Sequence, residues 1–125
     1  MTTITTMTKT IIDQYTNTPA ALLRLSNNKT LYIKFLKAFL SSNDFTALEE
    51  ALSMKNYAEA INILHTIKGL TGNLYLDPLF ELSAALMYQM QYGEYNESVI
   101  NDYRHTLALT IQAVTQLIDN LNSEP

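Results

Sequence analysis

Apolar residues recur every three or four positions along most of the chain after residue 17, which is the spacing of amphipathic α-helices. The pattern is clearest near the C-terminus, where a single narrow apolar stripe follows one helix face. That stripe comprises Val99, Ile100, Tyr103, Leu107, Ile111, Val114, Ile118 and Leu121. No segment shows a strand pattern of comparable quality, so the sequence predicts an all-α protein.

Cap and breaker residues divide the first half of this pattern into helices. Pro19 suits the first turn of a short helix that ends near Leu25. A second helix begins near Thr30, and the polar run at 41–44 bends or interrupts it. The same apolar spacing then continues to Leu52.

Two further helices follow in the middle of the chain. Asn56 with Glu59 three residues later resembles a capping box, which predicts a helix from about 57 to 75. Asp77 followed by Pro78 predicts the next start, with Asp77 as the cap. Gly93 ends that helix.

Asn96 caps a last long helix that carries the C-terminal stripe. Four substantial helices with short connections predict an antiparallel four-helix bundle with a short extra N-terminal helix. The predicted bundle spans residues 18–122. Residues 1–17 are Thr-rich and are predicted to be a flexible tail, with a short helical piece at 10–15. Residues 123–125 form a second tail.

Composition excludes several classes of function. The 125 residues are about the size of one domain. A net charge of −4 without a basic stripe argues against nucleic-acid binding and against anionic membranes. The chain has no cysteine, which excludes disulfides, thiolate nucleophiles and Cys-based zinc sites. It shows neither a signal-peptide core near its start nor a membrane-spanning apolar run, so we expect a cytoplasmic protein.

The stretch INILHTIKGLTGNL, residues 61–74, stands out within this helical pattern. It holds two of the three glycines, although glycine in a helix interior costs about 1 kcal/mol relative to alanine. On a helical wheel His65, Lys68, Gly69 and Gly72 share an arc of about 100° at the border of the apolar face. Both glycines therefore clear space around the imidazole. Close helix–helix packing or a fraying helix end is the alternative explanation for either glycine.

Two further sets of residues gather on opposite sides of this helix. The predicted core face comprises Ala60, Ile63, Leu64, Ile67, Thr71 and Leu74. The predicted polar face comprises Glu59, Asn62, Thr66 and Asn73. His65 thus projects from the flank of the helix, where another molecule can reach it.

The chemistry of these residues favours carrying a group over transforming one. A neutral imidazole nitrogen is a competent nucleophile. Lys68, one turn on, can neutralise part of the charge of a phosphoryl group on His65. The segment holds no acid or second base to run a hydrolysis. The two histidines are not joined by carboxylates at ligand spacing, so no metal site is expected, and His105 is predicted to be solvated and inert.

The segment HTIKG, followed by TGN and Leu74, resembles the histidine-containing phosphotransfer (HPt) domain of two-component phosphorelays. The family pattern is H-x-x-K-G, then small residues, then an apolar position. Asn56-Tyr57 stands where the family has an Asp followed by an aromatic residue, and Phe39 matches an aromatic on the preceding helix. The resemblance covers roughly residues 20 to 120, and the predicted bundle is the family's architecture.

The resemblance implies a role in two-component signal transduction. His65 would form the phosphohistidine, Lys68 would lie near the phosphoryl group, and Gly69 would let a receiver domain approach. Such domains are phosphocarriers without kinase activity of their own: they exchange the group with aspartates of response-regulator receivers, including those of hybrid histidine kinases. No cofactor of its own is implied, since Mg²⁺ belongs to the receiver. The expected docking surface comprises Gly69, Gly72, Ala58, Ile61, Asn62 and Asn73.

Two positions depart from the family pattern. Leu70 replaces the Ser or Ala of many members, and it is expected to pack away from His65. Met87 stands near a position where some members have a Gln or Glu that hydrogen-bonds the histidine. This leaves the second ring nitrogen to water or to another partner. Tyr88, Tyr92 and Tyr95 are expected to pack around the loop at Gly93, the alternative being that they form a contact surface.

Alternatives to phosphotransfer are open at this point. The first is a helical module that binds a receiver or kinase as an adaptor or inhibitor and transfers nothing. The second is a structural adaptor unrelated to phosphorelays. The chain reads as a free-standing protein, the alternative being a domain of a larger kinase. A monomer is expected because one bundle can bury all of these stripes.

Overall fold

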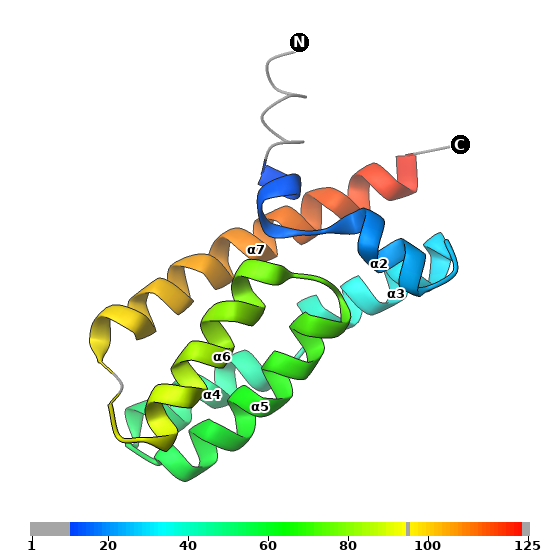
Figure 1. Ribbon diagram of the computed structural model, residues 1–125. Helices are drawn as coiled ribbons and strands as arrows, with labels where there is room; N and C mark the ends of the chain where they lie inside the picture. The colour runs from blue at the N-terminus through cyan, green and yellow to red at the C-terminus, as the bar shows by residue number, and fades with distance from the viewer. Residues whose placement is uncertain (1–10, 95, 124–125) are drawn as a thin grey trace.

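The structure is a computed structural model that describes residues 11–94 and 96–123 (Figure 1). Over these ranges it contains six packed helices, a further helical stretch at 11–15, and no strand, which confirms the predicted all-α class. The helices are α2 (Thr18–Arg24), α3 (Lys29–Leu40), α4 (Asp44–Ser53), α5 (Tyr57–Asn73), α6 (Asp77–Gln91) and α7 (Glu97–Ser123). None of these helices has both the length and the apolar character needed to cross a membrane.

Asparagine caps begin several of these helices. The Oδ1 atoms of Asn28, Asn56 and Asn96 accept hydrogen bonds from the backbone N–H three residues on, at 3.0, 3.3 and 3.0 Å. Each bond satisfies a backbone donor that has no partner within the helix. The predicted caps at Asn56 and Asn96 are therefore confirmed, and α3 begins at Lys29, directly after Asn28.

The helix ends turn tightly because residues just beyond them adopt left-handed backbone conformations. After α5, Tyr75 has φ +56°, and Leu76 N–H donates to the Thr71 carbonyl at 2.9 Å. This is the Schellman arrangement, which glycine usually supplies. Gly93, at φ +68°, ends α6 in the same way, as predicted. The sequence predicted Asp77 as the N-cap of α6, but the N-cap is Leu76 and Asp77 is already helical. Leu76 is also the last residue of the Schellman turn, so the cap lies one residue earlier than predicted.

The polar run at 41–44 breaks the predicted second helix into α3 and α4. Ser42 Oγ accepts from the Asp44 N–H at 3.1 Å and donates to the Asp44 carboxylate at 2.9 Å. Asn43, the residue before α4, makes no side-chain cap bond. Ser42 therefore holds the start of α4 in place of the N-cap residue.

Most of the packed helix pairs are consecutive along the chain, and the last helix, α7, also packs against α3. α5 packs against both α4 and α6, α6 against α7, and α7 against α3, while α2 lies on α3. α5 and α6 run in opposite directions, joined by a short turn (Figure 1). The largest fully buried side chains include Tyr32, Phe39, Leu64, Leu86 and Tyr103. Ile111 belongs to the predicted apolar stripe of α7, but its side chain is 38% exposed.

Residues 11–17 pack on the rest of the molecule, so the prediction of a flexible tail is wrong for this part. Ile12 and Thr16 are buried, and Thr16 Oγ donates to the Ile12 carbonyl at 2.7 Å. The Asn17 N–H donates to the Tyr75 carbonyl at 2.9 Å, which ties this segment to the α5–α6 turn. The remainder of the predicted N-terminal tail, residues 1–10, lies outside the described residues. Of the predicted C-terminal tail, Ser123 is the last residue of α7, and residues 124–125 lie outside the described residues.

Candidate functional site

One face of α5 is open to solvent and carries the candidate histidine. Ala58, Asn62, His65, Gly69 and Asn73 are all exposed, and their spacing of three or four residues places them on one side of the helix. The predicted core face is buried as expected: Ala60, Ile63, Leu64, Ile67, Thr71 and Leu74. Apart from the imidazole, this open face presents only small or neutral side chains.

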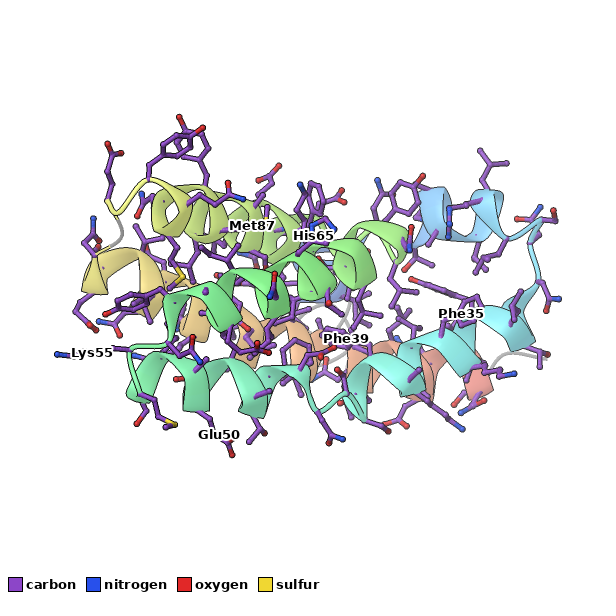
Figure 2. All side chains as sticks on the ribbon, turned by 90° about the horizontal axis from the view of Figure 1, so that it is seen from below. Phe35, Phe39, Glu50, Lys55, His65 and Met87 are labelled. Carbon is purple, nitrogen blue, oxygen red and sulfur yellow. The ribbon has the colours of Figure 1, made fainter. Side chains whose placement is uncertain are left out.

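The imidazole of His65 lies at the surface without a partner in the described part of the chain. It is exposed, and it makes no hydrogen bond or ion pair with residues 11–94 or 96–123. Figure 2 shows His65 on the side of α5 that borders α6, at the outer surface. Both ring nitrogens are therefore accessible to a reacting partner.

Gly69, one turn from His65, is surrounded by open space. A Cβ atom added at Gly69 would meet no atom within 4 Å outside its own helix backbone and immediate chain neighbours. Its φ lies outside the left-handed region, so the backbone conformation does not require glycine either. Nothing in the described chain explains a glycine here, while the missing side chain leaves the approach to His65 clear.

Gly72 has a different surrounding from Gly69. A Cβ atom at Gly72 would lie 3.0 Å from both Cδ1 and Cε1 of Phe80 on α6. The absent side chain lets the Phe80 ring pack directly on α5. Gly72 is thus a helix-packing glycine, the alternative explanation considered for it from the sequence.

The same contact fixes which residue of α6 lies opposite His65. Because α5 and α6 run in opposite directions, the residue seven positions before Gly72, which is His65, lies at the level of the residue seven positions after Phe80, which is Met87. Seven residues are about two helical turns, so this step returns to the same face on both helices. His65 therefore faces Met87, which is partly buried against the core (Figure 2). A thioether offers at most weak acceptance, so α6 supplies no strong partner for the ring.

Lys68 lies one turn beyond His65 and is partly exposed. Its ammonium forms no ion pair with any residue of the described ranges. The flexible four-carbon stem lets this ammonium swing toward a group held on the ring. His65 and Lys68 thus lie one turn apart on α5, with no partner for either side chain among the described residues.

The remaining predicted site residues divide between contact and support. Ile61 is partly buried and packs against the core, so it borders the open face without forming part of it. Leu70 also packs against the core, as predicted. The Asn73 side chain is exposed, while its carbonyl accepts a 3.2 Å hydrogen bond from Arg24 Nη1.

Two tyrosines at the end of α6 are exposed, which favours the contact-surface alternative over packing of the loop. Tyr88 and Tyr92 are 59% and 64% exposed, with ring centroids 4.7 Å apart. The prediction that they pack the loop at Gly93 is wrong for these two, and Tyr95 lies outside the described residues. Their four-residue spacing places them side by side on the helix surface and was the available signal.

The second histidine provides a comparison with His65. His105 is exposed on α7, as predicted. Its neighbour Arg104 is engaged elsewhere, in a bidentate ion pair with Glu49 of α4 whose shortest distance is 2.8 Å. No group of three or more His, Cys, Asp or Glu residues within 11–94 and 96–123 is arranged to hold a metal ion.

Comparison with known proteins adds no relative. No protein-family model, no curated protein and no solved structure matches the chain. What can be said of function therefore rests on the residues of α5 and their geometry.

Proposed function

We propose that this protein is a histidine phosphotransfer protein in which His65 accepts a phosphoryl group from the aspartyl phosphate of one receiver domain and passes it to another. The observation that carries the proposal is the free space around the imidazole. His65 is exposed, and a Cβ atom added at Gly69 would meet no atom of a neighbouring element within 4 Å. The neutral face of α5 around them suits docking of a second protein.

The proposed reaction is a displacement at phosphorus. One ring nitrogen of His65 forms a bond to phosphorus, and the bond from phosphorus to the aspartyl oxygen breaks. The carboxylate leaves with the electron pair, and the proton of the other ring nitrogen passes to water. The Lys68 ammonium pairs with a phosphoryl oxygen. Transfer to the second receiver is the same displacement in reverse, with Mg²⁺ bound by the receiver.

The finer architecture belongs to the same proposal. We assign α3 with α4, α5, α6 and α7 as the four members of an antiparallel bundle, and α2 as the extra N-terminal helix. The pairing of α5 with α4 and α6, and of α7 with α6 and α3, supports this assignment. The docking surface then comprises Ala58, Asn62, Gly69 and Asn73, bordered by Ile61, and a cytoplasmic location would give access to receivers.

The test uses a panel of purified receiver domains carrying radiolabelled aspartyl phosphate. We expect at least one receiver to lose its label to this protein, as an acid-labile and base-stable phosphate typical of phosphohistidine. Stable binding of a receiver without any transfer would instead support the adaptor alternative. Neither transfer nor binding across the panel would contradict both.

A further inference from the structure

A cavity of about 440 Å³ lies between α3 and the C-terminal end of α7, two helices that pack against each other. Four residues of α3 and one of α7 line it: Thr30, Ile33, Lys34, Lys37 and Asn122. Its size falls within the range of small-molecule sites, about 300–1,000 Å³. No residue of α5 lines it, so this cavity is separate from the candidate site at His65.

The polar lining of this cavity consists of groups that can donate hydrogen bonds. The ammonium groups of Lys34 and Lys37 can only donate, while the Asn122 amide and the Thr30 hydroxyl donate as well as accept. All four of these side chains are exposed. No Asp or Glu from the described part of the chain lines the cavity. Such a set of groups matches an anion.

Lys34 and Lys37 have no carboxylate partner of their own. Neither ammonium forms an ion pair or a hydrogen bond within residues 11–94 and 96–123. Asp119, one turn before Asn122 on α7, is exposed and does not pair with either lysine. Lys37 lies in the last turn of α3, where a cation stabilises the helix end, but this does not account for Lys34.

The two lysines are three residues apart on α3, so their side chains are neighbours on the helix surface. Like charges at this spacing repel each other and destabilise the helix slightly. An anion bound between the two ammonium groups would remove that repulsion, because each cation would then face an opposite charge.

The sequence around this cavity is cationic as well. Residues 14–43 contain four of the eight Lys and Arg residues and none of the twelve Asp and Glu residues. The rest of the chain therefore holds four cations against all twelve acids. A surface of this kind attracts anions, even though the molecule as a whole is acidic.

We propose that the cavity between α3 and α7 binds a small molecule that carries a diphosphate group. Two neighbouring ammonium groups match two linked phosphates, and lysine binds phosphate as a point charge. Ile33 packs against the core and is partly exposed, so with the aliphatic stems of the lysines it offers an apolar surface to the rest of the ligand. Inorganic diphosphate and nucleoside diphosphates share this chemistry. The inference does not rest on the proposed function, since His65 takes no part in it.

The test follows the backbone amide NMR signals of the full chain during titration with inorganic diphosphate, with ADP and with adenosine. Mg²⁺ is left out, because it would compete for the phosphates. We expect saturable shifts at Lys34, Lys37 and Asn122 with diphosphate and with ADP, and none with adenosine. Tighter binding of ADP would identify a nucleotide as the source of the group, and equal binding would assign recognition to the diphosphate alone.

Lys34→Gln and Lys37→Gln test the two cations separately. Each variant should raise the Kd for diphosphate about tenfold, through the loss of one charge-assisted contact. Lys55→Gln is the matched control, because it removes the same charge at the opposite end of the molecule from Phe35, the neighbour of Lys34 (Figure 2). It should leave the Kd within about twofold, since exposed charges at that separation are screened by salt. The same spectra report whether each variant keeps the fold.

Three results would overturn the site. The first is the absence of saturable shifts, or shifts centred on His65 and Lys68. The second is an equal loss of affinity in Lys55→Gln, which would show that net charge alone attracts the probe. The third is binding of a poly-glutamate peptide without binding of diphosphate, which would assign the surface to an acidic protein segment. All three are independent of phosphotransfer from a receiver, which is measured separately.

Discussion

Two glycines three positions apart on α5 have different surroundings. Each is expected to destabilise the helix by about 1 kcal/mol relative to alanine. At Gly72 this cost is offset by the Phe80 ring, which packs where a Cβ atom would lie. At Gly69 no contact among the described residues offsets it. The unexplained cost at Gly69 is what points to a partner at His65.

Gly69→Ala should therefore raise stability and lower activity together. Removing a helix glycine with nothing near its Cβ is expected to increase the free energy of unfolding by about 1 kcal/mol. The added methyl group should lower kcat/KM for transfer from a receiver about tenfold, which corresponds to about 1.4 kcal/mol. Denaturant titration and transfer kinetics measure the two effects. A more stable variant with unchanged kcat/KM would remove the docking explanation for Gly69.

Gly72→Ala is the matched control for this prediction. Its methyl group would press on Phe80 at 3.0 Å, so stability should fall by about 1 kcal/mol instead of rising. Combining it with Phe80→Leu should recover part of the loss, because the two sites are in direct contact.

The wheel of α5 predicted its core face, its polar face and the position of His65. It could not separate Gly69 from Gly72, since both lie on the border arc and a wheel says nothing of the neighbouring helix. Only the packing of Phe80 distinguishes them.

At the scale of the helices, the starts were predicted best where a side chain bonds to a backbone group a few residues away. Asn56 and Asn96 show this, because their caps depend only on local sequence. The start of α6 was displaced by one residue because Tyr75 takes the left-handed conformation that glycine usually adopts. The residue type at 75 gives no sign of this.

Two asparagines that precede consecutive helices should respond differently to alanine. Asn28 Oδ1 accepts from the Leu31 N–H at 3.0 Å, so Asn28→Ala should lower the free energy of unfolding by about 1 kcal/mol. Asn43 makes no such bond, so Asn43→Ala should change stability by less than about 0.5 kcal/mol. Thermal and denaturant unfolding of both variants measure the difference. Equal losses would contradict the assignment of Ser42 as the residue that holds the start of α4.

At the scale of the whole molecule, contacts between distant segments escaped prediction. Ile12 is buried and Asn17 bonds to Tyr75, although residues 11–17 look like the start of a polar tail in sequence. The cationic segment 14–43 was also missed, because the net charge of −4 averages over the whole chain. A local count of charges would have found it, whereas the burial of Ile12 depends on tertiary packing.

Buried tyrosines should make the fold sensitive to alkali. Burial raises the pKa of Tyr103 above its ordinary value of 10.0, and the nearby Glu49 carboxylate adds to the rise. Burial also raises the pKa of Tyr32, partly opposed by its hydrogen bond with Thr18. The folded pKa lies above the unfolded one, so the stabilisation is fully present below pH 10.0 and is lost as pH rises beyond it.

We therefore expect the free energy of unfolding to fall above pH 10.0, by up to about 1.4 kcal/mol per pH unit for each tyrosine that titrates only on unfolding. Tyr103→Phe should make this fall shallower. Denaturant titrations across the alkaline range, with and without the substitution, provide the measurement. The same slope in both proteins would show that Tyr103 ionises freely in the folded state.

The proposed function depends on one histidine out of two. His65 and His105 are both exposed, so exposure alone does not distinguish them. Only His65 has an open glycine one turn away and an unpaired cation, Lys68, at its side within the described chain. The decisive measurement is transfer of label from a phosphorylated receiver to the wild type, to His65→Gln and to His105→Gln. We predict an acid-labile phosphate on the wild type and on His105→Gln, and none on His65→Gln. Transfer that survives His65→Gln but disappears with His105→Gln would contradict the account.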